Sequence, residues 1–436
     1  MPNPLWRSNF ATFMRSEPTK PSPLTLILAF VCCFLPFVAS AQYSNTGSKV
    51  QLGIDVLEAN RFAELRGKKV GLLTHPAGVN RNGVSTIQVL HSARAVNLTT
   101  LFGPEHGIYG NEKADVPVLD KVDTRTGLPV YSLYGKYRKP TPEMLRNIDT
   151  LVVDLQDIGT RSYTFVSCMK LAIEACFENN KEVIILDRPN PLGGLKVDGP
   201  PMEAKWQSYV GAFRVPYVHG LTIGELARMA VSTPGILQVT ESQRLNGDLK
   251  VITMEGWNRY MSWPQTGLKW VPTSPFIPDF ESVVGYPMTG LGAQLGGFKH
   301  GIGSEYPFRC LRYGAMDIDK LHAELKACNI PGIAFTKRKT KQGTGLYIRV
   351  TDWKTWRPTE LSFYMMQLTA KFEAGNPFAA ATDSKATLFN KHTGSSSWWN
   401  QLVTKGEQAN VSGYITLWQR QAKQYQIESR RFWLYD

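Results

Sequence analysis

Four apolar runs that look like buried strands each end in polar residues, and this feature constrains the fold more than any other. The runs cover residues 70–73, 98–102, 151–153 and 183–186. In an open α/β sheet, ligands bind beyond the carboxyl ends of the strands. We therefore expect the polar ends to converge on one site, with these candidates: His75, Glu105, His106, Asp154, Gln156, Asp157, Arg161, Asp187, Arg188 and Asn190.

Helical and strand-like patterns alternate between residues 56 and 232, which predicts a Rossmann-like, mostly parallel sheet. Thr222 and Glu225 form a capping-box pattern at the start of the last helix. His219, just before this cap, is a further candidate for the site or for a turn. The strands are expected at 69–74, 98–102, 150–155 and 182–186, and the helices at 56–65, 85–95, 141–148, 163–179 and 222–232.

The pattern changes after about residue 257, where prolines interrupt the chain and a glycine-rich stretch follows at 290–303. Shorter mixed elements come next, so we expect a smaller α+β C-terminal domain. Helices are predicted at 317–327 and 359–373, and strands at 333–336 and 346–351. The domain boundary falls within 280–290. The predicted organisation is a signal peptide over 1–41, a Rossmann-like catalytic domain over 42–284 and an α+β domain over 285–436.

The N-terminal segment has the features of an export signal. Basic residues precede an apolar stretch at 24–38, and Ala39-Ser40-Ala41 gives a small-x-small cleavage site. We expect export to the periplasm or the medium, with no stable membrane insertion after cleavage; a membrane anchor is the alternative. Export permits disulfides. Of the remaining cysteines, Cys168 and Cys176 lie two helical turns apart, too far to pair, and a Cys310–Cys328 bridge stays open.

The chain carries a formal net charge of +13. Its lysines and arginines are scattered and no nucleic-acid motif is present, which favours a solvated surface or attraction to an anionic polymer over nucleic-acid binding. No GxGxxG, Walker, HExxH or GxSxG pattern occurs, and no cysteine–histidine spacing suggests zinc. We therefore expect no cofactor and no metal. Nothing in the sequence defines the oligomeric state.

Glu105 is the first candidate for catalysis. It follows a predicted buried strand and has glycines at 103, 107 and 110, which allow close approach of a ligand. A carboxyl group in a semi-apolar cleft has the raised pKa that a general acid needs. The alternative is a turn-capping role. His106 would tune Glu105, bind substrate or ligate a metal, or be a hydrogen-bonded structural residue, and His75 has the same alternatives.

Asp154, Asp157 and Arg161 form the densest polar cluster. Asp154 and Gln156 share one side of the extended chain, and Arg161 has the geometry to hold a carboxylate in bidentate fashion. The alternative is an ion pair that braces the loop. Asp187-Arg188-Pro189-Asn190-Pro191 is a similar segment, in which two prolines give a rigid loop. Asp187 would either face a ligand or cap a turn.

Six ordered motifs resemble the exo-β-N-acetylmuramidase family, and the resemblance spans nearly the whole chain after the signal. They are Val70-Gly71-Leu72-Leu73-Thr74, Pro104-Glu105-His106-Gly107, the run from Thr126 to Gly135, Asp154 to Gly159 with Arg161 and Tyr163-Thr164, Leu186 to Pro191, and His219 to Thr222 with Gly224-Glu225.

The resemblance implies a Rossmann-like domain, a smaller C-terminal domain and an active site in the cleft between them. It also implies release of N-acetylmuramic acid from the non-reducing end of peptidoglycan fragments, so muramyl sugars are the expected partners. Glu105 takes the position of the family's candidate catalytic glutamate, with Asp154 and Asp157 as further catalytic candidates. Arg161 or Arg188 would pair with the lactyl carboxylate.

One stretch departs from the family pattern, which commonly has two glutamates and an arginine before a Pro-Phe pair. Here Gln294, His300 and Ile302 take those places, and Gly301 and Gly303 survive. His300 joins the substrate-binding candidates. Besides the glycosidase, two alternatives follow: a non-catalytic protein that binds cell-wall sugars, and a metal-dependent hydrolase using His106 with Asp154 or Asp187.

Overall fold

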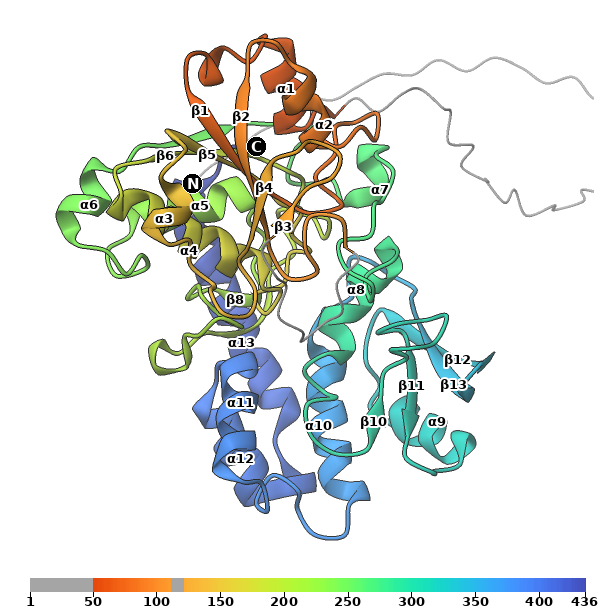
Figure 1. Ribbon diagram of the computed structural model, residues 1–436. Helices are drawn as coiled ribbons and strands as arrows, with labels where there is room; N and C mark the ends of the chain where they lie inside the picture. Colours follow the sequence, from red (N-terminus) through yellow and green to blue (C-terminus); the bar gives the residue numbers. More distant parts are fainter. Residues whose placement is uncertain (1–49, 111–120) are drawn as a thin grey trace, which may run out of the picture. The chain divides into compact units, whose positions relative to one another are not determined.

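A mostly parallel sheet organises the N-terminal half of the protein. The computed structural model describes residues 50–110 and 121–436. In this part of the chain seven strands pair in the order β3-β4-β2-β1-β5-β6-β9, and every pair except β3–β4 is parallel (Figure 1). The strands are β1 (Lys69–Thr74), β2 (Asn97–Gly103), β3 (Lys121–Val122), β4 (Pro129–Ser132), β5 (Thr150–Asp154), β6 (Glu182–Leu186) and β9 (Leu249–Ile252).

Helices cover both faces of this sheet, which explains why its central strands are buried at every position but one. Alternate residues point to opposite faces. Val152 therefore packs with the helices α1 and α2, whereas Leu151 and Val153 pack with α3, α4 and α5. These helices are α1 (Gly53–Ala59), α2 (Thr86–Ser92), α3 (Pro142–Leu145), α4 (Phe165–Glu178) and α5 (Ile223–Ser232); α6 (Glu241–Asn246) packs against α4. The predicted Rossmann-like fold is confirmed.

The predicted strands agree closely with the structure, and the capping box of α5 is confirmed. Thr222 Oγ1 accepts from the Glu225 N–H at 3.2 Å, and Glu225 Oε2 accepts from the Thr222 N–H at 3.0 Å. The helix predicted over 56–65 is present, but its predicted bounds are wrong. It starts at Gly53 and ends at Ala59, because Arg61 and Phe62 adopt left-handed φ angles of 54° and 55° that an α-helix does not tolerate.

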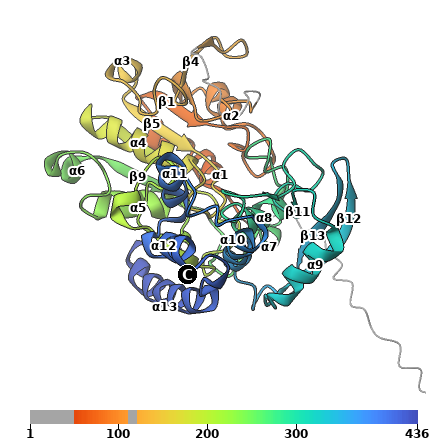
Figure 2. The same cartoon turned by 90° about the horizontal axis from the view of Figure 1, so that it is seen from below.

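The C-terminal half contains an antiparallel sheet with the order β10-β11-β13-β12, flanked by helices. Figure 2 shows α10, α12 and α13, which contact one another. The predicted smaller α+β region is confirmed, although α8, α11, α12 and α13 were not predicted. The elements are α8 (Phe280–Thr289), β10 (Phe298–Lys299), β11 (Cys310–Tyr313), α9 (Ile318–Ala327), β12 (Ile333–Thr340), β13 (Gly343–Val350), α10 (Glu360–Phe372), α11 (Asp383–Thr393), α12 (Ser396–Lys405) and α13 (Val411–Ser429).

A short antiparallel pair, β7 (Asp198–Pro201) with β8 (Pro216–Val218), and the single-turn helix α7 (Trp263–Thr266) complete the fold. Cys168, Cys176, Cys310 and Cys328 are free thiols, so the Cys310–Cys328 bridge that the sequence left open is not formed. Within the described ranges, no helix has the length and apolar character needed to cross a membrane. The predicted signal segment, 1–41, lies outside the described residues.

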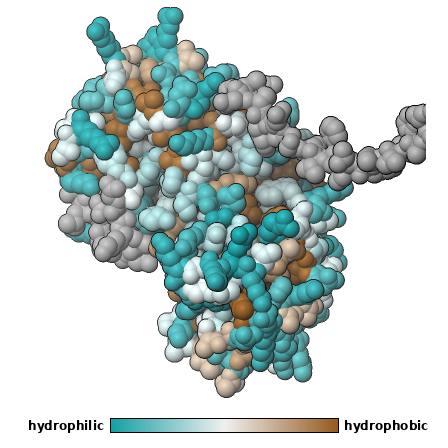
Figure 3. Space-filling model, turned by 90° about the vertical axis from the view of Figure 1, so that its right-hand side faces the viewer, coloured by the Kyte–Doolittle hydropathy of each residue, from teal (hydrophilic) through white to brown (hydrophobic). Residues whose placement is uncertain are grey.

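The face drawn in Figure 3 mixes hydrophilic residues with several separate apolar patches. The large apolar side chains that are most exposed in the described part of the chain are spread along the sequence, as with Val122, Leu245, Tyr260 and Ile427. Single exposed apolar residues are normal for a folded surface. This face therefore does not point to a docking area.

Candidate active site

The sheet topology places a crevice between β1 and β5. From β1 the chain proceeds through α2 to β2 on one side, and from β5 through α4 to β6 on the other, so the strand order reverses between β1 and β5. Ligands bind at such a switch point, beyond the carboxyl ends of the strands. Thr74 and Asp154 are paired in register there. Just beyond them His75 Nε2 accepts a hydrogen bond from the Gln156 N–H at 2.9 Å.

The Asp154 carboxylate is bound to Arg188. Arg188 Nε donates to Oδ1 at 2.5 Å and Nη2 donates to Oδ2 at 2.8 Å, a bidentate pair with both residues buried. Thr86 Oγ1 donates to Asp154 Oδ2, and Arg188 Nη2 also donates to the Val79 carbonyl. Both residues lie at the predicted edge, but their charges are directed at each other. Asp154 therefore fits the alternative in which an aspartate–arginine ion pair braces the loop, but its partner is Arg188 rather than Arg161.

Asp187 is also fully engaged. Its carboxylate accepts from the Arg188 and Gly224 N–H groups, from the Thr222 hydroxyl and from the Tyr435 hydroxyl, at 2.6–2.9 Å. Burial raises its pKa, and these donors counteract the rise. Asp187 therefore holds the start of α5 and the C-terminal segment against β6.

Asn190 has a similar turn-forming role. Its Nδ2 donates to the Leu221 carbonyl and its Oδ1 accepts from the Leu192 N–H. Gly159 adopts a left-handed φ of 79°, and a Cβ there would lie 2.4 Å from Asn190 Oδ1. The loops after β5 and β6 are thus packed against each other, which leaves Asn190 without the ligand-facing role that was predicted.

Arg161 binds main-chain carbonyls instead of a carboxylate. Nη1 donates to Pro200 and Val215, and Nη2 donates to His392 and Thr393, at 2.6–3.1 Å. The side chain is 1% exposed, and burial lowers its pKa to about 10. Arg161 therefore ties the loop after β5 to the end of α11. The expectation that Arg161 or Arg188 pairs with a substrate carboxylate is not supported by this geometry.

Glu105 follows β2 and is only half-buried. Thr164, the residue before α4, donates through its hydroxyl to Glu105 Oε2 at 3.2 Å. The turn after Glu105 is built by His106 and Gly107, which adopt left-handed φ angles of 71° and 70°; His106 is buried. Glu105 is thus held at the edge of the sheet on a tight turn, where it remains accessible.

Asp157 is the second carboxylate at this edge, after Glu105, with an oxygen that has no hydrogen-bond partner in the described part of the chain. Oδ2 accepts from the Gly159 N–H at 2.7 Å and lies 3.3 Å from His219 Nε2. His219 Nδ1 accepts from the Leu221 N–H, so Nε2 carries the ring proton and faces Asp157. In the described part of the chain, Asp157 Oδ1 and the neighbouring Gln156 Oε1 are buried without a hydrogen-bond partner. Buried polar atoms in native proteins nearly always have a hydrogen-bond partner, and a bound polar ligand would supply the missing partners here.

A row of aromatic rings connects this edge to the C-terminal half. His75 contacts Phe165, Phe165 contacts Tyr163, and Tyr163 contacts Tyr286, with centroids 4.7, 4.9 and 6.0 Å apart. The row continues from Tyr286 to Phe308 and on to His300, at 4.9 and 4.8 Å. Burial lowers the pKa of His300 to about 4. The structure thus connects His300 to the predicted site through packed rings.

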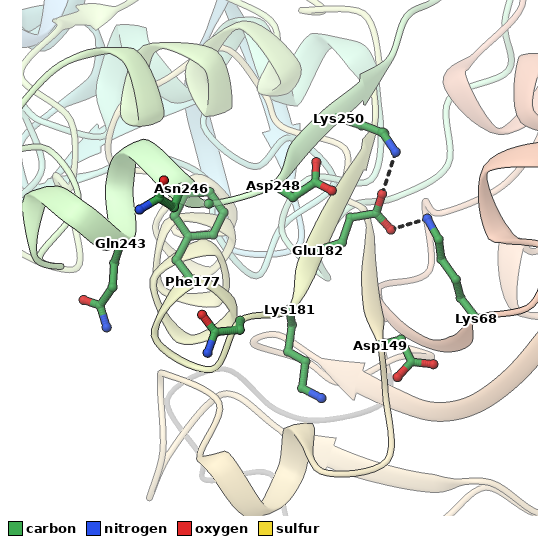
Figure 4. Close-up of a pocket in the computed structure, with 11 residues that line it drawn as sticks. Lys68, Asp149, Phe177, Lys181, Glu182, Gln243, Asn246, Asp248 and Lys250 are labelled. Carbon is green, nitrogen blue, oxygen red and sulfur yellow. Dashed lines mark hydrogen bonds and ion pairs between the residues drawn. The ribbon is translucent and has the colours of Figure 1, made fainter.

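A cavity of about 370 Å³ lies at the opposite edge of the sheet, near the amino ends of β1, β5, β6 and β9 (Figure 4). Glu182 bridges Lys68 and Lys250 there, at 2.6 and 2.8 Å. The residues that line this cavity include none of the predicted site residues. In residues 50–110 and 121–436, no group of three or more His, Cys, Asp and Glu side chains is arranged to hold a metal ion. The metal-dependent alternative therefore has no geometric support in these ranges.

Sequence reasoning missed Thr164, Ser162 and Tyr286 as neighbours of the site. Ser162 Oγ contacts the hydroxyls of Tyr217 and Tyr286 at 2.7 and 3.3 Å. Tyr286 precedes a proline within α8, far from the strand ends in the sequence, and no local pattern marks it. Thr164 lies three residues after Arg161, the last residue of the Asp154–Arg161 motif. This closeness in sequence was the one signal that could have placed Thr164 near the site.

The fold and the carboxylates at the sheet edge define a Rossmann-like α/β protein with a C-terminal α+β region. The family model described as exo-β-N-acetylmuramidase NamZ, N-terminal, matches residues 70–281, and its C-terminal counterpart matches residues 284–435. The chain therefore belongs to the exo-β-N-acetylmuramidase NamZ family and is a glycoside hydrolase.

Relatives agree with this membership. The chain is 41% identical over 315 residues to the peptidoglycan β-N-acetylmuramidase NamZ of Bacillus subtilis (strain 168), covering 70% of this chain and 73% of the relative. Crystal structures of two DUF1343 family proteins from Bacteroides fragilis NCTC 9343 match with TM-scores of 0.79 and 0.68. Their sequence identities are 39% and 25%, and both matches cover 89% of this chain and 99% of the other.

The neutral state of His75 gives a testable pH dependence. Burial, followed by the charge of Arg188, lowers its pKa to about 3 from an ordinary value of 6.5. At pH values between these two, His75 is protonated in the unfolded state but neutral in the folded state. The free energy of unfolding therefore rises with pH, by up to about 1.4 kcal/mol per pH unit. We expect His75→Phe, which keeps a ring against Phe165, to lose this part of the slope in urea unfolding from pH 4 to 6.5. Exposed His91→Phe is the control, and an unchanged slope in His75→Phe would contradict the prediction.

Proposed function

We propose that the protein releases N-acetylmuramic acid from the non-reducing end of peptidoglycan fragments, with Glu105 as general acid and base. The observation that carries this proposal is the pair of carboxylates, Glu105 and Asp157, that remain available at the carboxyl edge of the sheet. The other two acids of this edge, Asp154 and Asp187, are saturated by internal partners. The B. subtilis relative is named a peptidoglycan β-N-acetylmuramidase, which agrees with this substrate class.

Glycoside cleavage needs a proton donor at the leaving oxygen and a group that supports an oxocarbenium-like transition state. In the proposed mechanism the Glu105 carboxyl gives its proton to the glycosidic oxygen, and the Thr164 hydroxyl orients the carboxyl through Oε2. Asp157 supports the developing positive charge through Oδ1, while the Gly159 N–H holds Oδ2, which lies 3.3 Å from His219 Nε2. Water then adds to the anomeric carbon and gives one proton to the Glu105 carboxylate, which restores the acid.

We place the substrate in a cleft between the edge of the parallel sheet and the C-terminal region. Support comes from the ring row that starts at His75 and ends at His300, since residues from both halves meet in it. Tyr286 and Phe308 would form the C-terminal wall. His300, in the stretch that departs from the family pattern, would then contact the substrate from that wall.

Glu105→Gln should slow the reaction strongly without unfolding the protein, because the amide is too weak an acid to protonate the glycosidic oxygen and Glu105 is only half-buried. We expect kcat on a chromogenic β-N-acetylmuramide to fall by about 10²- to 10⁴-fold, with an unchanged Tm. Glu143→Gln, a change at a carboxylate with 66% of its side chain exposed, is the matched control.

Full activity of Glu105→Gln would refute the catalytic assignment. If the wild-type protein released neither the muramide nor its N-acetylglucosaminide counterpart, yet bound muropeptides, the non-catalytic alternative would be favoured.

Asp154 and Asp157 should respond differently to removal of their charge. Asp154→Asn leaves Arg188 buried without its counter-ion, so we expect the free energy of unfolding to fall by about 3–5 kcal/mol. Asp157→Asn keeps an oxygen for the Gly159 N–H, so the loss should be in kcat, by about tenfold or more, with a much smaller loss of stability. Urea unfolding and steady-state kinetics on both variants separate the effects, and equal loss of stability would argue against a special role for Asp157.

We also propose that the protein is exported through the segment 1–41, in agreement with a substrate in the cell wall. The support is the sequence pattern alone. Expression of the full chain in a bacterial host should give a mature protein that begins at Gln42, measured by mass spectrometry of the periplasmic and secreted fractions. Replacing Ala39 and Ala41 by bulky residues should block processing. A full-length cytoplasmic product from the unaltered chain would contradict the proposal.

A further inference from the structure

Arg138 lies on the loop after β4, in a position that the mechanism above does not use. Its guanidinium is 4.0 Å from the ring centroid of Tyr209 and 4.9 Å from that of Tyr134. The two contacts fix the plane of the guanidinium against aromatic faces. The side chain is nevertheless exposed, so the N–H groups at its edge can reach a ligand.

The guanidinium of Arg138 is free to bind an anion, unlike those of Arg161 and Arg188. In the ranges that the structure describes, no carboxylate or carbonyl accepts a hydrogen bond from it. The stacked arginine offers a planar fork of donors whose geometry matches a carboxylate. Because its orientation is already fixed by the rings, little side-chain freedom is lost when an anion binds.

Arg138 lines a cavity of about 470 Å³ together with Ser167 and Tyr209. Ser167 Oγ and the Tyr209 hydroxyl are buried without a hydrogen-bond partner in the described part of the chain. Two orphaned hydroxyls beside an unpaired guanidinium indicate a polar, anionic ligand.

The start of α4 connects the cavity to Glu105. Ser167 is in the first turn of α4, and Thr164, which donates to Glu105, directly precedes that helix. Burial raises the pKa of Tyr209, the charge of Glu105 raises it further, and the charge of Arg138 lowers it. The Tyr209 hydroxyl therefore lies within electrostatic reach of both charges.

We propose that Arg138 is the specificity residue that binds the lactyl carboxylate of the muramyl sugar, while Ser167 and Tyr209 bind the polar groups beside it. This inference rests on the proposed function. N-acetylmuramic acid differs from N-acetylglucosamine in the lactyl ether and its carboxylate. A single guanidinium beside Glu105 would therefore let the site distinguish these two sugars.

The test is a calorimetric titration of Arg138→Gln and the wild-type protein with N-acetylmuramic acid and N-acetylglucosamine, which require no turnover. We expect Arg138→Gln to lose about 10- to 100-fold in affinity for N-acetylmuramic acid, in line with a charge-assisted hydrogen bond, and to keep its affinity for N-acetylglucosamine. Arg138→Lys should fall between the two. Exposed Arg420→Gln, on α13, is the control, and Tm values confirm folding.

Muramyl dipeptide distinguishes a lactyl carboxylate from a peptide carboxylate. Its lactyl group is joined to the peptide as an uncharged amide, and its negative charge is on the peptide. Its affinity should be the same in Arg138→Gln and wild type; an equal loss for both ligands would show that Arg138 does not select the lactyl carboxylate and would overturn the proposal. Unchanged preference for N-acetylmuramic acid in Arg138→Gln, or no preference in wild type, would also overturn it. If the wild type cleaves no muramide but binds N-acetylmuramic acid through Arg138, the hydrolytic function fails and this inference stands.

Discussion

The buried ion pair between Asp154 and Arg188 is the interaction on which the site depends. It joins the ends of β5 and β6 and also binds Thr86 at the start of α2. A buried pair of this kind contributes little net stability relative to apolar packing, but removal of one partner is costly. Its main effect is to fix the loops that follow the two strands, and these loops carry Asp157 and Asn190.

The same pair determines which groups are left for a ligand. Arg188 is neutralised by Asp154, and both Nη atoms of Arg161 donate to carbonyl groups, so neither guanidinium presents its paired N–H groups to a carboxylate at the switch point. Among the candidates at this edge, the carboxylates of Glu105 and Asp157 remain available, and Arg138 lines the cavity beside Tyr209. A carboxyl group that donates a proton and a guanidinium that binds a carboxylate, both close enough to affect Tyr209, would suit a sugar that carries its own acid.

Much of the fold could be predicted because strong periodicity marks buried strands. Residues 150–154 are apolar at most positions and flanked by helical patterns, so β5 was predicted to within a residue. The strand Leu249–Ile252 was missed because its residues are only partly buried, which leaves a weak signal. The helix near residue 56 was predicted to run too far because Arg61 and Phe62 adopt left-handed φ angles, which are uncommon for these residue types and are not predicted by propensity.

The sequence by itself determined that acids, histidines and an arginine follow parallel strands, and therefore that they share one edge of the sheet. It did not determine which of them remain free. That depends on partners distant in the chain: Arg161 donates to the carbonyl of Thr393, 232 residues away, and Asp187 accepts from Tyr435, 248 residues away. The availability of a polar group is a property of its whole surroundings, since a buried donor or acceptor binds whichever partner the tertiary fold supplies.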